Sequence, residues 1–222
     1  MFLGHFAIAF AAKRAAPEVS LGTLFIGAQL ADLLWPLFFL LGIEDFEIRP
    51  GITAVTPFEF TRYPYSHSFV ALVGWAIVFA GAYAIARGAR LRVVIVLAAT
   101  VLSHWVLDVL THIPDMPVTI HGDVRLGLGL WNSIAGTLLV ELVMFAAGLF
   151  LYVRTTRAVD RIGRIALWSL VAFLVAIYLA SVFGPPPPSK LALALTGLAM
   201  WLLIAWAYWV DRHRQPRLVV SA

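Results

Sequence analysis

Cysteine is absent from this chain of 222 residues, and charged residues are scarce, at 13% of the total. Without cysteine the protein has no disulfide bonds and no thiolate ligands for a metal ion. The scarcity of charge goes with a hydrophobic content of 62% and a mean hydropathy of +0.91, which together exclude a soluble globular domain. The sequence therefore predicts an integral membrane protein.

Apolar stretches fill most of the sequence, and several approach the ~20 residues that a helix needs to cross a bilayer. They predict an all-α fold, namely a polytopic bundle of transmembrane helices with six full spans. A shorter apolar segment at residues 2–12 comes first, and it is expected to be a re-entrant or partial span. The six full spans are expected at about residues 20–41, 66–86, 91–112, 130–153, 165–183 and 190–210.

Basic residues are concentrated in alternate loops and in the C-terminal tail. Because cytoplasmic loops carry an excess of lysine and arginine, these segments and the C-terminus are expected to be cytoplasmic. The pI of about 9.8 then reflects membrane topology, and we expect no nucleic-acid partner. The loops at 42–65, 113–129 and 184–189 are expected to face outward. Twelve of the sixteen lysines and arginines lie in the segments 13–14, 87–92, 154–164 and 212–217.

A polar stripe interrupts the span at 91–112. His104, Asp108 and His112 are spaced four residues apart, so they are expected on one face of a helix. A carboxylate in hydrocarbon costs roughly 2.5–3.5 kcal/mol on insertion scales, which favours a buried site that binds a ligand. The predicted topology brings three further side chains of the ligand type to the same outer half of the membrane: His5, Asp32 and His67.

Imidazole and carboxylate ligands without thiolates suit Zn²⁺, Mn²⁺ or Fe²⁺ better than an all-oxygen Ca²⁺ or Mg²⁺ site. We expect one or two divalent ions, with Zn²⁺ the first choice. Simpler interpretations stay open. Asp32, His104 and Asp108 can be structural polar groups that tie helices together. His5, His67 and His112 can be interfacial histidines in contact with water, and His112 can also cap the helix end.

The same segments resemble the bacterial family of predicted membrane-bound metal-dependent hydrolases, which is thought to be distantly similar to zinc-dependent phospholipase C and P1 nuclease. The resemblance implies a mostly helical inner-membrane protein. Many members carry Thr-His and Pro-Asp-x-Asp, where this chain has Gly4-His5 and a lone Asp32, which removes one carboxylate of a two-metal site. The matching segments are 4–5, 31–32, 55–68, 103–115 and 127–133. The ligands implied are His5, Asp32, His67, His104 and Asp108.

The resemblance covers roughly residues 1–153, and it divides the chain. We assign residues 1–153 to a metal-site membrane domain. Residues 154–222 form a two-helix apolar extension with a basic tail, within the same membrane domain overall. The two spans of the extension contain no internal charge, so they are assigned to packing, lipid contact or oligomerisation. The oligomeric state is left open.

Several residues near the predicted site have two interpretations each. The loop at 42–65 is either a lid or mouth for the site or an interfacial loop that packs into headgroups. Arg62 and Asn132 are candidate substrate-binding residues, and Arg125 could also hold a phosphate. Such arginines more often meet lipid headgroups. For Glu141, a structural hydrogen bond is favoured over a catalytic role.

Together these features predict a metal-dependent hydrolase that acts at the outer face on a phosphoester of a lipid or lipid-linked substrate. His112 is the candidate general acid or base, or a spare ligand. The alternative is a small permease or a metal or proton transporter that uses the same stripe. A third possibility is a purely structural metal. A transporter needs polar groups on both sides of the midplane, and the inner half is nearly bare, which favours the enzyme.

Overall fold

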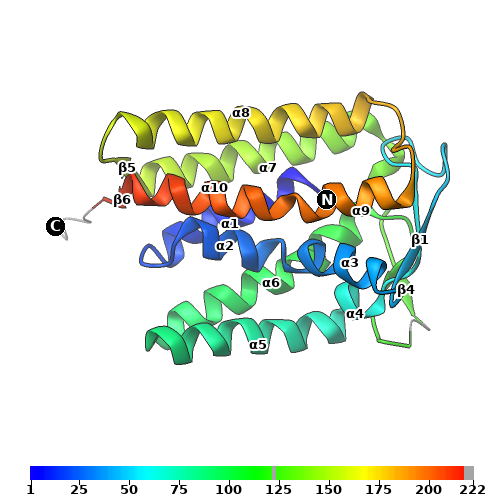
Figure 1. Ribbon diagram of the computed structural model, residues 1–222, viewed down its shortest axis with the longest axis horizontal. Coiled ribbons are helices and arrows are strands. Elements are labelled where there is room, and N and C mark those ends of the chain that lie inside the picture. Colours follow the sequence, from blue (N-terminus) through cyan, green and yellow to red (C-terminus); the bar gives the residue numbers. More distant parts are fainter. Residues whose placement is uncertain (122–123, 218–222) are drawn as a thin grey trace.

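The computed structural model describes residues 1–121 and 124–217, and its long helices run side by side along the long axis of the molecule (Figure 1). The helices are α1 (Leu3–Ala15), α2 (Leu21–Ala28), α3 (Leu30–Leu40), α4 (Pro64–His67), α5 (Phe69–Arg87), α6 (Leu91–Thr111), α7 (Ile134–Thr155), α8 (Arg161–Phe183), α9 (Lys190–Leu198) and α10 (Met200–Arg212), with a single 3-10 turn, η1, at Leu130–Asn132.

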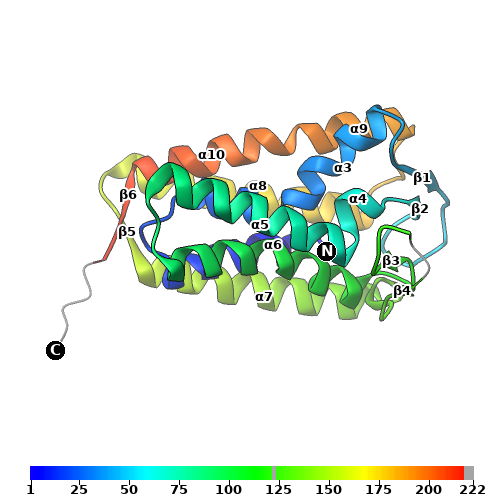
Figure 2. The same ribbon diagram turned by 90° about the horizontal axis from the view of Figure 1, so that it is seen from below.

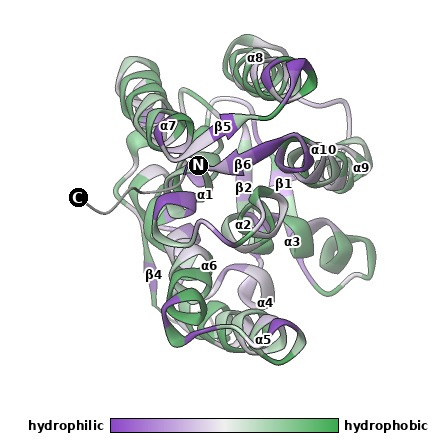
Figure 3. Ribbon diagram, turned by 90° about the vertical axis from the view of Figure 1, so that its left-hand side faces the viewer, coloured by the Kyte–Doolittle hydropathy of each residue, from purple (hydrophilic) through white to green (hydrophobic). Residues whose placement is uncertain are grey.

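Within the residues that the structure describes, five helical segments are long and apolar enough to cross a membrane: α5, α6, α7, α8 and the stretch Lys190–Arg212 that contains α9 and α10. Helices α2 and α3 pass the same test together, but they are bent by 58° at Gln29, so the pair is a broken span or a re-entrant loop. Large side chains such as Ile85 and Leu202 are exposed on the outer faces, where Figure 3 shows mostly hydrophobic residues. The predicted membrane protein is confirmed at this level, and a sixth span depends on the bent pair.

Helix α1 lies among the other helices, where it contacts α7, α2 and α6 (Figure 3). Its 13 residues cover ~20 Å, which is less than the ~30 Å of a hydrocarbon core. Leu3, Phe6 and Phe10 are fully buried. Gly148 of α7 permits the close approach, because a Cβ there would lie 2.2 Å from the carbonyl oxygen of Ala7. The N-terminal segment is therefore an internal helix of the bundle.

In the described residues, three short two-stranded antiparallel sheets depart from the all-α prediction. β1 (Asp45–Ile48) pairs with β2 (Phe58–Arg62), β3 (Met116–Pro117) with β4 (Arg125–Leu126), and β5 (Thr156–Ala158) with β6 (Arg214–Pro216). All lie at the ends of the bundle, where the chain leaves its long helices (Figure 1). The first forms from the predicted outer loop, and its Phe46 packs with Trp35 and Tyr63 in a buried aromatic cluster. These aromatic side chains thus pack within the protein.

The two ends of the bundle differ in composition. The basic loops between α5 and α6 and between α7 and α8, with the end of α10, lie at the left-hand end of Figure 1, as the alternation of basic loops predicts. The hairpins β1–β2 and β3–β4, with α4, lie at the other end. The C-terminal helices pack between these ends against the rest of the chain, since α10 contacts α2 and α8, and α9 contacts α3 (Figures 1 and 2).

Candidate metal centre

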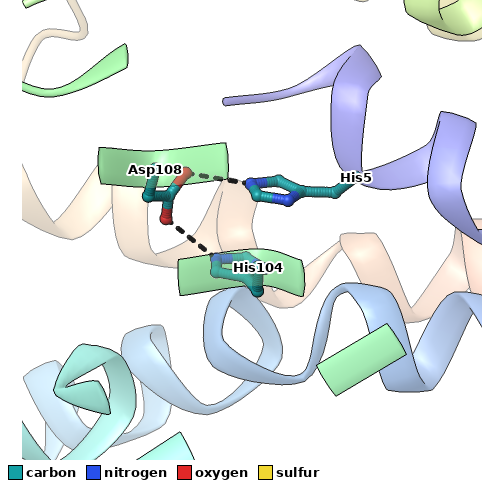
Figure 4. A group of neighbouring side chains, drawn as sticks. All are labelled: His5, His104 and Asp108. Atoms are coloured by element: carbon teal, nitrogen blue, oxygen red, sulfur yellow. Dashed lines mark hydrogen bonds and ion pairs between the residues drawn. The ribbon is translucent and has the colours of Figure 1, made fainter. Parts of the chain in front are cut away.

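The centre is built around α6. His104 and Asp108 lie four residues apart on its inner face and are buried, as the stripe predicts, and Thr100 is buried one turn before them. His5 of α1 lies on one side of this stripe. Its Nε2 is 3.0 Å from Oδ1 of Asp108, and Nε2 of His104 is 3.1 Å from Oδ2 (Figure 4). The rings of His5 and His104 stack with centroids 3.8 Å apart. These residues form the first ligand-type group.

A second group shares His104 with the first. Asp32 lies in the first turn of α3, directly after the bend, and His67 ends α4. Oδ1 of Asp32 is 3.4 Å from Nε2 of His67 and 3.7 Å from Nε2 of His104. Nε2 of His67 is also 3.9 Å from Oδ2 of Asp108. The structure thus brings together the five residues that the sequence analysis named as ligands, from α1, α3, α4 and α6.

The hydrogen bonding of His104 fits a cation. Its Nδ1 lies 2.8 Å from the carbonyl oxygen of Ala28, which can only accept, so Nδ1 carries a proton, and in the neutral imidazole Nε2 keeps its lone pair. That Nε2 is buried and makes no hydrogen bond within the described part of the chain. It faces carboxylate oxygens of Asp32 and Asp108, which are also lone-pair donors. A divalent ion between them satisfies all three atoms.

His67 is oriented through a second buried carboxylate. The hydroxyl of Ser66 donates to Oε2 of Glu44 over 2.6 Å, and Oγ of Ser66 is 2.7 Å from Nδ1 of His67. With its hydrogen given to Glu44, Ser66 accepts from Nδ1–H, which leaves the lone pair of Nε2 directed at the centre. Oε1 of Glu44 also accepts from the backbone amides of Tyr65 and Ser66. This pair cannot be predicted from the sequence, because only the folded loop brings Glu44 to Ser66.

The start of α1 is tied to the same region. Glu141 of α7 accepts from the backbone amides of Phe2 and Gly4 at 3.0 and 3.2 Å. The structural hydrogen bonding expected of Glu141 is thereby confirmed. The amino group of Met1 lies 2.5 Å from Oδ1 of Asp108 and is fully buried. The oxygen Oδ1 is thus occupied by His5 and Met1, whereas Oδ2 faces the imidazoles of His104 and His67.

His112 lies beside the two groups but belongs to neither. Helix α6 ends at Thr111, and His112 has extended backbone angles, so its side chain leaves the stripe. The amides of Leu128 and Gly129 bond the carbonyls of Val109 and His112, which closes this helix end. Nδ1 of His112 is 2.9 Å from Asp115. His112 then lines a small cavity of about 180 Å³ together with Asp32, His67 and Asp108.

The hairpin β1–β2 covers this cavity, since Phe58 and Phe60 line it. The position fits the lid or mouth interpretation of the 42–65 loop. Beside it, the Tyr63 hydroxyl donates to Asp115 over 3.3 Å. Burial and the neighbouring Asp115 carboxylate raise the pKa of Tyr63 well above its usual range, so the phenol stays a donor.

The candidate substrate residues lie further out. Arg62 is exposed on β2 and donates to the carbonyl oxygen of Gly42. Arg125, on β4, donates to the carbonyl oxygens of Phe60 and Thr61 and so ties the two hairpins together. Asn132 is exposed in η1. None of the three lines the small cavity, and their role in binding substrate stays a prediction.

Comparison of the chain with protein-family models, with curated proteins and with solved structures finds no match. The resemblance to membrane-bound metal-dependent hydrolases therefore rests on the residues quoted above and stays a prediction. The structure itself adds that buried His and Asp groups can hold a metal ion.

Proposed function

We propose that this protein is a membrane-embedded metal-dependent hydrolase whose ligands are His5, Asp32, His67, His104 and Asp108. The observation that carries the proposal is the buried Nε2 of His104, which has no hydrogen bond in the described chain and faces two carboxylates. Five histidine and carboxylate ligands suit Zn²⁺ first, and also Mn²⁺ or Fe²⁺. A bound ion would supply Lewis-acid activation of water and of a phosphoester.

The protein residues around the small cavity suit proton transfer during hydrolysis. Asp115 accepts from Nδ1–H of His112, which leaves Nε2 of His112 free to take a proton from water and return it to the leaving oxygen. His112 is fixed by its bond to Asp115 and by the tilted ring of Trp131, 4.2 Å away. The cavity beside Asp32, His67 and Asp108 leaves room for water and a phosphate, which favours an enzyme over a purely structural metal.

The proposed orientation follows from the basic residues. With the basic end of the bundle in the cytoplasm of a bacterial cell, the C-terminus is inside and the metal centre opens outward from the inner membrane. The transporter alternative needs a polar path to the other end. Between the centre and that end, Phe6, Phe10 and Phe25 pack edge to face with no exposed surface, and they close the interior.

The first test is the metal content of the detergent-purified protein, measured by elemental mass spectrometry. We expect one or two equivalents in the parent protein and their loss in His104→Ala and Asp108→Ala, with folding retained. His121→Ala is the matched control, since His121 is exposed in the 113–129 loop. A parent protein that stays metal-free after incubation with Zn²⁺ or Mn²⁺ would contradict the proposal. Metal-loaded protein is then assayed for release of phosphate or alcohol from phospholipids.

A further inference from the structure

A second, larger cavity opens from the metal centre into the membrane-spanning part of the protein. Its volume is about 720 Å³, within the ~300–1,000 Å³ of small-molecule sites. Asp32, His67 and Trp35 line one end. The walls come from α8, through Phe173 and Ile177, and from α9 and α10. The two spans that the sequence assigned to packing, lipid contact or oligomerisation therefore supply most of the lining.

The cavity changes in polarity along its length. Asp32 and His67 are its charged or ionisable lining residues, and Ser181 and Thr196 add hydroxyls, whereas the remainder of the lining is apolar or glycine. The indole N–H of Trp35 is buried and lacks a hydrogen-bond acceptor among the residues described. It is therefore, within the described chain, a donor without an acceptor on a residue that lines the polar end. A ligand that matches this lining has one polar head and a long apolar part.

The dimensions and the surroundings suit a lipid chain. The lining runs along α9 and α10 from Leu193 to Trp206, which is ~20 Å of helix. One leaflet is half of the ~30 Å hydrocarbon core, so ~15 Å of acyl chain fits this length. Leu202 and Phe173, on the two walls, are 71% and 44% exposed. Because the medium around these spans is hydrocarbon, a chain can enter from the side without crossing water.

We propose that this space, the lipid chamber, binds one acyl chain of a membrane phospholipid and thereby places its phosphoester at Asp32 and His67. The proposal rests on the proposed function and specifies its substrate class. The chain lies between α8 and α10, and the phosphate lies where the chamber meets the metal centre. The indole N–H of Trp35 donates to a headgroup or ester oxygen. Thus α8, α9 and α10 select a lipid, and α1, α3, α4 and α6 supply the metal ligands.

The test uses the full-length protein in nanodiscs that contain a phosphatidic acid with a photoreactive diazirine in one acyl chain. After illumination, the adducts are mapped by mass spectrometry. We expect adducts on α8 and α9–α10 at the chamber lining to exceed those on the lipid-facing side of α5. Excess unlabelled phosphatidic acid should reduce the chamber adducts. Labelling spread evenly over the exposed helices overturns the proposal.

Matched substitutions sharpen the test. Ser181→Phe fills the chamber, whereas Ala180→Phe adds the same ring to an adjacent, exposed position outside the lining. Because an overfilled site binds less well, we expect Ser181→Phe to lower the chamber adducts about tenfold, equivalent to about 1.4 kcal/mol. We expect Ala180→Phe to leave the chamber adducts unchanged. Ala199→Phe, in the lining at the junction of α9 and α10, and Ala205→Phe, outside the lining on α10, repeat the comparison should Ser181→Phe not fold. Equal labelling of both members of each pair contradicts the proposal.

Labelling also separates this proposal from the proposed function. It needs no metal, so it should persist in the chelated protein and in His104→Ala. If labelling fails while the protein binds metal, the lipid chamber is wrong and the metal centre stands. If labelling succeeds while the protein binds no metal, the lipid chamber stands and the metal centre is wrong.

Discussion

Two carboxylates that are largely removed from solvent, Asp108 and Asp211, lie near opposite ends of the bundle and differ in their surroundings. Asp211 at the basic end is bonded on both oxygens. Lys13 and the amide of Leu21 donate to Oδ2 at 2.6 and 2.9 Å, and the hydroxyl of Tyr152 donates to Oδ1 at 3.1 Å. Asp108 also has a bonded oxygen, Oδ1, but its Oδ2 faces imidazole nitrogens without a hydrogen bond to either.

The comparison separates a structural ion pair from a candidate ion site. Around Asp211 the donors match the acceptors, and the pair ties α1, α2, α7 and α10 together. With neutral imidazoles, the atoms around Oδ2 of Asp108 are lone-pair donors, and a cation is the group that satisfies them. The side chains of Asp108 and Asp211 are only 3% and 12% exposed, so low exposure alone does not distinguish the two sites. The two sites are distinguished by Oδ2 of Asp108, which has no hydrogen bond within the described part of the chain, whereas both oxygens of Asp211 accept hydrogen bonds.

The largest effect on stability is expected at the structural pair. Asp211→Ala leaves the buried ammonium of Lys13 without its counter-ion, which typically costs about 3–5 kcal/mol of unfolding free energy. The change is measured by chemical unfolding in detergent, followed by tryptophan fluorescence. The metal stoichiometry of the folded protein should be unchanged, because Asp211 lies at the opposite end of the bundle. Loss of metal in folded Asp211→Ala would contradict the assignment of Asp211 to a structural ion pair and of Asp108 to the ion site.

Metal binding should stabilise the folded protein by a smaller amount. At a free Zn²⁺ concentration 100 times the Kd, the unfolding free energy should rise by about 2.7 kcal/mol. Asp108→Asn removes the charge of the carboxylate at nearly constant volume and should abolish this increase, whereas Asp211→Asn should retain it. The measurement is the same unfolding curve with and without Zn²⁺. An equal increase in Asp108→Asn and the parent would place the ion elsewhere.

A still smaller effect is expected from the carboxylate that orients His67. Glu44→Gln weakens the acceptor for the Ser66 hydroxyl and loosens the imidazole, which should reduce Zn²⁺ affinity by about 10–100-fold without changing the stoichiometry. Competition with a metal-sensitive dye measures the Kd. Glu47→Gln is the control, because Glu47 is exposed on β1 and pairs with Lys190. Unchanged affinity in Glu44→Gln would leave Glu44 with a purely structural role in the loop.

Much of the helical architecture could be predicted from the sequence, because apolar length alone sets the long helices. The bend between α2 and α3 was not predicted. The helix breaks at Gln29, and glutamine is not a residue that signals a helix break. The hairpin β1–β2 was not predicted either. Its strands are four and five residues long, and their pairing depends on contacts with Trp35 and Tyr63 that only the folded protein supplies.

The grouping of the candidate site followed from periodicity and charge. The four-residue spacing put His104 and Asp108 on one face, and the loop charges brought His5, Asp32 and His67 to the same end. Two features escaped this reasoning. The helix ends one residue before His112, so the stripe loses its third member. The walls of the lipid chamber come from residues without charge, which give no signal in a sequence read for polar groups.

The smallest effect is expected where a hydrogen bond serves structure beside the metal centre. Tyr63→Phe removes the bond from the phenol to Asp115, which should cost about 1 kcal/mol of unfolding free energy and leave metal binding intact. Because burial raises the pKa of the Tyr63 phenol in the folded protein, this contribution should be constant below the unfolded pKa of about 10 and shrink above it, as the unfolded phenol ionises. Unfolding of the parent and the variant across this pH range measures the difference, with the half-exposed Tyr65→Phe as the control. A difference that grows above pH 10 would show that the phenol is ionised in the folded protein, and then the bond to Asp115 would not exist as drawn.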